Sequence, residues 1–144
     1  MPSKLKVFLD TSAILAGLNS PTGAAGTILA ACFDGKILPV ISMQIIEEAE
    51  RNIPAKFPKI APAWKSFLLI PPKLTPDPAK EEIQTAYRIL PTDDAPILMA
   101  ALKFQPDAFV TWNTRHFYRA EVQRIAAFPI VTPGEFLKLF AKDY

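Results

Sequence analysis

Short apolar runs alternate with longer helical stretches along the chain. The apolar runs contain β-branched side chains and are bounded by turn residues, so they predict five buried strands, at residues 4–9, 37–42, 67–70, 108–111 and 129–132. Ala-rich or amphipathic stretches predict helices at residues 11–18, 24–33, 43–56, 61–67, 79–90, 95–103, 114–127 and 133–142. This alternation predicts a mostly parallel five-stranded sheet with helices on both faces, a three-layer α/β/α sandwich.

Turn and capping residues set the boundaries of these elements. Ser42 is placed to cap the helix over residues 43–56, which has apolar positions at helical spacing at Ile45, Ile46, Ala49 and Ile53. Prolines in residues 71–78 predict an extended linker, and Pro96 is tolerated because it falls in the first turn of its helix. Nothing in the pattern marks a boundary between domains, so we expect one domain over residues 1–144.

Composition narrows the class of protein. Of 144 residues, 50% are hydrophobic and 21% charged, which is typical of a globular domain and not of a disordered chain. The apolar runs are too short to cross a bilayer, and no signal-peptide pattern precedes the first strand. A single cysteine, Cys32, is expected to be a small core residue in a protein of the reducing cytoplasm. The net charge of +2 is too small to indicate nucleic-acid binding by itself.

Acidic residues fall where predicted strands end or on helix turns that face those ends. Asp10 follows the first strand, Glu47 and Glu48 lie in the helix after the second, and Asp93 and Asp94 begin the helix before the fourth. Asn113 follows the fourth strand. Ligands in open parallel sheets bind outside the carboxyl ends of the strands, so these side chains are expected to converge on one rim. Oxygen ligands of this kind suit Mg²⁺ or Mn²⁺ rather than zinc, and one histidine with one cysteine argues against a closed zinc site.

Each of these residues also has an ordinary structural interpretation. Asp10 is equally well placed to cap the helix that follows it, and one of the two residues Asp93 and Asp94 is expected to be a helix cap. Taken alone, Glu47 and Glu48 are better explained as solvated helix charges, although Glu48 borders the apolar stripe and Glu47 does not.

The residues after the fourth strand have similar alternatives. Arg115 is either a surface cation or a phosphate ligand, and His116 is more often a satisfied polar residue than a metal ligand. Trp112 either packs at the strand end or stacks on a nucleic-acid base, with equal support.

Four blocks in this order resemble the PIN-domain family, and more narrowly its stand-alone, VapC-like type. The resemblance covers nearly the whole chain and rests on Val7-Phe8-Leu9-Asp10-Thr11-Ser12, on the helix start from Ser42 to Glu48, on Asp94-Ala95-Pro96-Ile97 with Ala100 and Ala101, and on Phe109-Val110-Thr111-Trp112-Asn113 with His116-Phe117. It implies a Rossmann-like fold and a ribonuclease that depends on a divalent metal ion, Mg²⁺ or Mn²⁺.

The resemblance also assigns roles to individual residues. It implies that Asp10, Glu48 and Asp94 hold the metal ion, with Thr11 or Ser12 supporting these acids by hydrogen bonds. Asn113 stands where many family members have a fourth acid, usually aspartate, so the resemblance leaves open whether one or two metal ions bind.

Substrate and partners follow from the same resemblance. The substrate would be single-stranded or looped RNA, held by basic residues such as Lys103, Arg115, Arg119 and Arg124, with Trp112 and His116 beside the site. The family further implies a toxin neutralised by a small antitoxin protein. It also implies a homodimer, for which the apolar stretches 14–18 and 28–33 offer either an interface or ordinary core.

Other functions have less support. A haloacid-dehalogenase-like phosphatase would also begin with an aspartate after the first strand, but it needs a second acid where Ser12 stands. A P-loop enzyme is excluded because the chain has no Gly-rich stretch ending in Gly-Lys-Ser/Thr. A non-catalytic PIN-like module that binds RNA or protein is the remaining alternative, and Asn113 is its only support.

Overall fold

A parallel sheet of five strands forms the centre of the protein. The computed structural model describes residues 4–140, and in that range the strands are β1 (Leu5–Leu9), β2 (Ile37–Ile41), β3 (Lys73–Leu74), β4 (Ala108–Val110) and β5 (Ile130–Val131). Their order in the sheet is β3-β2-β1-β4-β5, and every pairing is parallel. The sequence-based prediction of an α/β fold with a parallel sheet is therefore confirmed.

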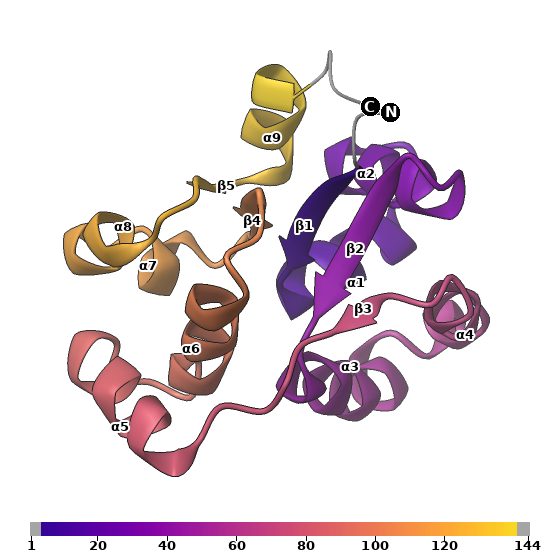
Figure 1. Ribbon diagram of the computed structural model, residues 1–144. Helices are drawn as coiled ribbons and strands as arrows, with labels where there is room; N and C mark the ends of the chain where they lie inside the picture. Colours follow the sequence, from indigo (N-terminus) through magenta and orange to yellow (C-terminus); the bar gives the residue numbers. More distant parts are fainter. Residues whose placement is uncertain (1–3, 141–144) are drawn as a thin grey trace.

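The helices come in two groups because the strand order reverses. The first crossovers contain α1 (Thr11–Asn19), α2 (Ala24–Phe33), α3 (Met43–Lys56), a 3₁₀ turn (Pro58–Ile60) and α4 (Ala61–Leu68). The later ones contain α5 (Lys80–Ile89), α6 (Ala95–Phe104), α7 (Thr114–Phe117) and α8 (Ala120–Ile125), and α9 (Pro133–Phe140) follows β5. Right-handed crossovers put α1–α4 and α5–α8 on opposite faces of the sheet, whereas α9 packs against α2. Figure 1 shows α1–α4 on one side of the view and α5–α8 on the other.

Two predicted elements differ from the structure. The third strand, predicted at residues 67–70, is wrong: Phe67 is buried in α4 and stacks on Trp64 with ring centroids 5.8 Å apart. The strand lies instead in the proline-rich linker, where Val40 pairs with Lys73 and Ile41 with Leu74.

The helix predicted at residues 114–127 is two short helices. Extended backbone at Arg119 (φ −62°, ψ 142°) separates α7 from α8. The last predicted helix, 133–142, is present up to Phe140, and its final two residues lie outside the described range.

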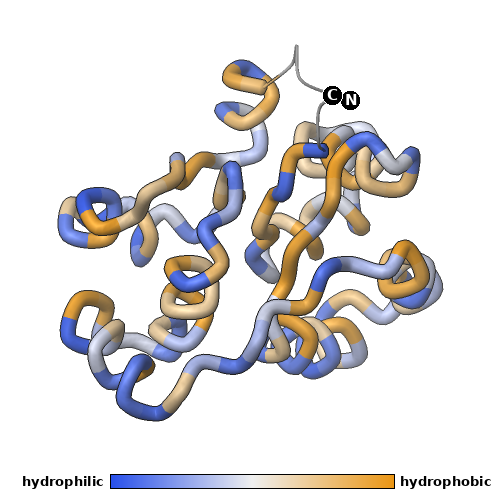
Figure 2. Tube along the Cα trace, in the orientation of Figure 1, coloured by the Kyte–Doolittle hydropathy of each residue, from blue (hydrophilic) through white to orange (hydrophobic). Residues whose placement is uncertain are grey.

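The core fills both faces of the central strands. All three residues of β4 are buried, as are the last three of β1, which is the pattern of a sheet covered on both sides. Phe8 stacks on Phe109 with ring centroids 5.2 Å apart, which joins β1 to β4. Figure 2 shows hydrophobic segments along β1 and β2 in the middle of the molecule and mainly hydrophilic ones between β3 and α5.

Close backbone packing holds α1, the helix that starts beside Asp10, against α2. A Cβ atom on Gly17 of α1 would lie 2.9 Å from the carbonyl oxygen of Ala25 in α2, so glycine lets the two helices approach closely. Cys32 on α2 is buried as expected, and burial raises the pKa of its thiol to about 12. Among residues 4–140, no helix combines the length and the apolar character needed to cross a bilayer.

Candidate functional site

The candidate site lies where the strand order reverses, between β1 and β4. Asp10 follows β1, and its backbone N–H donates to the carbonyl oxygen of Val110 at 3.0 Å, so the ladder continues one residue past the strand. Thr111 follows β4 directly, which brings residues from opposite halves of the chain to one point. This reversal is where open α/β sheets bind their ligands.

Asp10 is the most buried acid of the site. Its side chain is 4% exposed, and its Oδ2 atom accepts hydrogen bonds from Thr111 Oγ1 (2.7 Å) and Ser12 Oγ (3.1 Å). Burial raises the pKa of this carboxyl to about 6, and the charges of Asp94 and Glu48 push the same way, although the Thr111 hydrogen bond partly opposes them. Asp10 occupies the N-cap position of α1 but its side chain makes no capping hydrogen bond, so its carboxylate is not used as a cap.

The serine and threonine after Asp10 serve different acids. Ser12 Oγ accepts a hydrogen bond of 2.9 Å from the backbone N–H of Trp112, which ties the start of α1 to the segment after β4. Thr11 Oγ1 donates to Glu48 Oε2 at 2.8 Å instead of to Asp10. Ser12 and Thr11 therefore each bond one of the acids, Asp10 and Glu48.

Glu48 projects from α3. This helix begins at Met43 and is capped by Ser42 as predicted, since Ser42 Oγ accepts a hydrogen bond from the backbone N–H of Ile45. The Glu48 carboxyl has a raised pKa because it is partly buried, and the negative charge of Asp94 raises it further, while the Thr11 hydrogen bond lowers it. Glu47 is exposed and does not line the pocket that contains Glu48. The helix phase thus points Glu48, not Glu47, at the site.

Asp94 lies at the start of α6 and faces the residues after β4. Its Oδ2 atom accepts a hydrogen bond of 2.9 Å from Asn113 Nδ2 and lies 2.6 Å from His116 Nδ1. Asp94 occupies the N-cap position of α6 without a side-chain capping bond, and its neighbour Asp93 is exposed. Asp94 is therefore neither a free surface charge nor a side-chain cap, because its carboxylate contacts Asn113 and His116 at the site.

All three acids share one arrangement of hydrogen bonds. Within residues 4–140, the hydrogen bonds to the side chains of Asp10 and Asp94 all fall on Oδ2, and the one to Glu48 falls on Oε2. One oxygen of each carboxylate is thereby oriented, and the second makes no hydrogen bond within the described residues. Supported acids with a remaining oxygen are what a hard cation such as Mg²⁺ requires.

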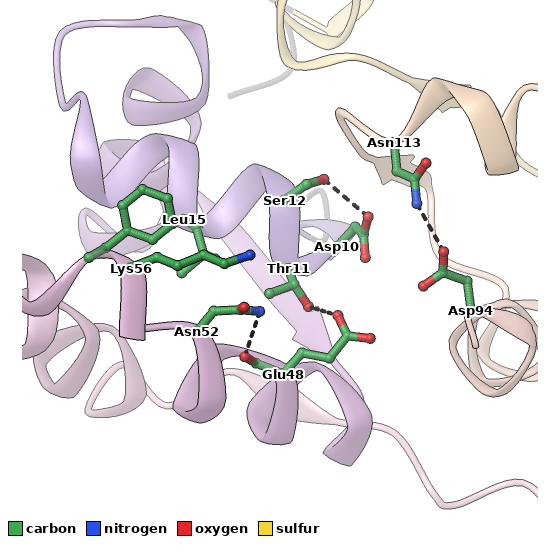
Figure 3. A pocket seen from close by; sticks show the side chains of 10 residues that line it. Asp10, Thr11, Ser12, Leu15, Glu48, Asn52, Lys56, Asp94 and Asn113 are labelled. Atoms are coloured by element: carbon green, nitrogen blue, oxygen red, sulfur yellow. Dashed lines mark hydrogen bonds between the residues drawn. The ribbon is translucent and has the colours of Figure 1, made fainter. Parts of the chain in front are cut away.

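These side chains line a single pocket of about 280 Å³ (Figure 3). Its walls are Asp10, Thr11, Ser12, Leu15, Glu48, Asn52, Lys56, Phe57, Asp94 and Asn113. The donor set consists of oxygens, and burial already penalises the charge on two of its three acids, so a divalent cation would relieve the repulsion between them. No group of three His, Cys, Asp or Glu side chains in the described part of the chain is arranged to hold a metal ion as it stands.

The predicted substrate-binding residues lie at different distances from this pocket. Trp112 is next to it and 49% exposed, whereas His116 is half-buried behind Asp94. Arg115, Arg119 and Arg124 are exposed and outside the pocket lining. Lys103 forms an ion pair of 3.0 Å with Glu82, so its ammonium is already matched by a carboxylate.

Sequence reasoning did not single out several residues that the structure brings to the site. Thr111 is fully buried and bonds Asp10, which its position directly after an apolar strand could have suggested. Asn52 and Lys56 line the pocket with Glu48. The three are four residues apart, so the helical period would have placed them on one face. Leu15 and Phe57 carried no signal that separates them from core residues.

Comparison with known proteins finds a matching family and similar folds. A family model described as PIN domain matches residues 6–115. The fold is similar to the crystal structure of PAE2754 from Pyrobaculum aerophilum, with a TM-score of 0.65, 17% identity and coverage of 96% of this chain and 97% of that chain. It is also similar to VapBC2 from Rickettsia felis bound to a DNA fragment from their promoter, with a TM-score of 0.60, 16% identity and coverage of 88% and 97%. No curated protein matches the sequence significantly.

Proposed function

This chain belongs to the PIN-domain family, whose members are generally nucleases, and from that premise we propose that it is a VapC-like ribonuclease dependent on a divalent metal ion. The observation that carries the proposal is the pocket at the strand reversal, which gathers Asp10, Glu48 and Asp94. Three carboxylates that line one pocket repel one another, and burial further penalises the charge of Asp10, so a bound cation would relieve both costs.

We assign the metal site to the three acids, with Mg²⁺ or Mn²⁺ as the ion. When bound, such an ion supplies a water of lowered pKa and stabilises charge on the phosphoryl oxygens. The chain's own residues orient the ligands: Thr111 and Ser12 hold Asp10, and Thr11 holds Glu48.

Asn113 and His116 are assigned to the support of Asp94. Both contact Asp94 Oδ2, and Asn113 Oδ1 accepts from the backbone N–H of His116, so the three residues form a closed group. Asn113 thus replaces a fourth carboxylate by a hydrogen-bond donor, which favours one tightly held ion over two. The phosphodiester of RNA would meet the acids from the open side, with Trp112 and Arg115 beside it.

Partners and location follow the family. We propose a small antitoxin protein as a partner, because the similar VapBC2 structure is a complex, and a homodimer as the working form. We further propose that residues 1–144 act as one domain in the cytoplasm.

Cleavage of a mixed pool of single-stranded and transfer RNA tests this function. The purified protein is incubated with Mg²⁺, with Mn²⁺ or with EDTA, beside the variants Asp10→Asn and Glu47→Gln. We expect metal-dependent cleavage that is lost in Asp10→Asn and kept in Glu47→Gln, because Asp10 lines the pocket and Glu47 does not.

The alternative is a non-catalytic PIN-like module that binds RNA or protein. The hydrogen bond from Asn113 to Asp94 favours it, because an amide donor stands where many family members have an acid. RNA bound without cleavage under either metal ion would select this alternative.

A further inference from the structure

One end of the pocket is built from residues that none of the assigned roles uses. Beyond Glu48 the wall consists of Leu15 from α1, Asn52 and Lys56 from α3, and Phe57 directly after α3. Leu15 and Phe57 are half-buried and pack against the core, so this end has a firm apolar surface. Lys56 supplies the positive charge there, and no other cation lines the pocket in the described part of the chain.

Helix α3 places Lys56 on the same face as Glu48. Glu48, Asn52 and Lys56 are spaced by four residues, and eight residues of helix span about 12 Å along the axis. Side chains on a helix lean toward its N-terminus, which shortens the gap between the ammonium and the acids. Figure 3 shows the Lys56 side chain extended beside Leu15 with its Nζ atom directed toward the acids.

Asn52 makes this wall continuous. Its Nδ2 atom donates to the backbone oxygen of Glu48 at 2.9 Å, so the side chain lies along the helix between the other two. A ligand that extends from the acids along α3 therefore meets a polar amide, an ammonium and apolar side chains.

We propose that this end of the pocket is a subsite for the nucleotide next to the cleaved bond. In it Lys56 binds the adjacent phosphate, and Leu15 and Phe57 contact the sugar or base. The inference rests on the proposed ribonuclease function and specifies its substrate: a strand that carries a second phosphate beside the scissile one. An ammonium is a compact charge suited to a phosphate, and repulsion from three acids makes a cation at that position valuable to an approaching polyanion.

A purely structural role for Lys56 makes a different prediction. Lys56 lies in the last turn of α3, where a cation interacts favourably with the helix dipole. Such a role would change thermal stability in Lys56→Gln and leave RNA binding and its salt dependence unchanged.

The first test is binding of a short fluorescent single-stranded RNA, in EDTA so that cleavage does not interfere. Lys56→Gln, Lys56→Arg and the control Lys59→Gln are compared with the wild type; Lys59 is an exposed lysine three residues on that does not line the pocket. We expect Lys56→Gln to bind about fivefold more weakly. The slope of log affinity against log salt should fall by about 0.7, the value for one phosphate contact on a single strand. Lys56→Arg should retain most binding and Lys59→Gln all of it.

The second test places one neutral methylphosphonate linkage next to the cleaved bond. The wild type should cleave this RNA more slowly than the unmodified one, and Lys56→Gln should not distinguish the two. Two results together would overturn the subsite alone. The wild type would bind RNA, with Lys56→Gln binding as tightly as Lys59→Gln, and the neutral linkage would slow cleavage by the wild type and by Lys56→Gln equally. A wild type that neither binds nor cleaves RNA would overturn the ribonuclease proposal and the subsite with it.

Discussion

Thr111 donates a hydrogen bond of 2.7 Å to Oδ2 of Asp10, so the residue after β4 holds the acid that follows β1. The two residues are 101 positions apart in the chain, and they meet because β1 and β4 are neighbours in the sheet. The bond lowers the pKa of Asp10, but burial outweighs it and the pKa stays raised, at about 6. Asp10 is therefore ionised at neutral pH, and its buried charge lowers the stability of the folded protein.

Asp10 should make the metal-free protein less stable as the pH rises. The folded pKa of about 6 exceeds the ordinary 3.8, so the carboxyl is easier to bury when protonated. Its stabilising contribution is complete below pH 3.8 and is lost as the pH rises through 6, which amounts to about 3 kcal/mol. Urea unfolding in EDTA from pH 4 to pH 8 should show this decline in the wild type. Asp10→Asn should show a smaller decline, since the raised pKa of Glu48 still contributes, and the exposed control Asp93→Asn should keep the wild-type decline. Parallel curves for wild type and Asp10→Asn would contradict the assignment.

Thr111→Val should raise the pKa of Asp10 further. The substitution keeps the shape of a fully buried side chain but removes the donor to Asp10 and the acceptor for the backbone N–H of Asn113. A loss of about 1 to 3 kcal/mol is expected at pH 8, and a smaller one at pH 5, where Asp10 is mostly protonated. Thr111→Ser retains the hydroxyl and should lose less. A loss that does not depend on pH would show that the hydrogen bond to Asp10 is not the cause.

Divalent ions should stabilise the fold through Glu48 and not through Glu47. The two acids are adjacent on α3, but only Glu48 lines the pocket, and burial raises its pKa. Thermal unfolding in Mn²⁺ at a hundred times its dissociation constant should gain about 2.7 kcal/mol over EDTA. Glu48→Gln should lose most of that gain, whereas Glu47→Gln should behave as the wild type. Equal effects of the two substitutions would exclude Glu48 as a ligand.

Asn113→Asp should exchange stability for metal affinity. The amide of Asn113 donates to Asp94 at 2.9 Å, and an aspartate there would set two carboxylates against each other. In EDTA its melting temperature should fall below that of the wild type. Added Mn²⁺ should raise it by more than it raises the wild type, because the fourth acid can share a cation. Calorimetric titration with Mn²⁺ would show whether a second ion binds; a variant as stable as the wild type in EDTA would contradict the expected repulsion.

Much of this fold could be predicted from local patterns, and the failures have a physical cause. Ala24–Phe33 and Met43–Lys56 match their predicted helices to the residue, because long periodic stretches with clear breakers carry a strong signal. Residues 67–70 form a short apolar run, for which helix and strand look alike. The true β3, Lys73–Leu74, is exposed and is held by backbone pairing with β2, which leaves no trace in side-chain pattern.

The site could be predicted in part for a related reason. Asp10 and Asn113 could be predicted as site residues because they follow predicted strands, and the topology brings the carboxyl ends of those strands to one rim. Asn113 as a donor to Asp94, and Thr111 as a donor to Asp10, depend on tertiary distances that sequence spacing does not encode. The eight-residue spacing from Glu48 could have placed Lys56 on the same helix face. Exposed lysines are so common, however, that this spacing alone does not indicate a site residue.

Trp112→Ala should weaken RNA binding with little effect on the fold. The indole is 49% exposed, and the link to Ser12 uses the backbone N–H of Trp112, which the substitution keeps. The free energy of unfolding should therefore change by less than about 0.5 kcal/mol. A base stacked on the indole contributes about 1 to 3 kcal/mol, so the dissociation constant for single-stranded RNA should rise by roughly fivefold or more. Tyr87→Ala is the matched control, since Tyr87 is 54% exposed on α5 and does not line the acid pocket. Equal losses in the two variants would indicate nonspecific aromatic contacts, whereas a loss confined to Trp112→Ala places the RNA across the carboxyl end of β4.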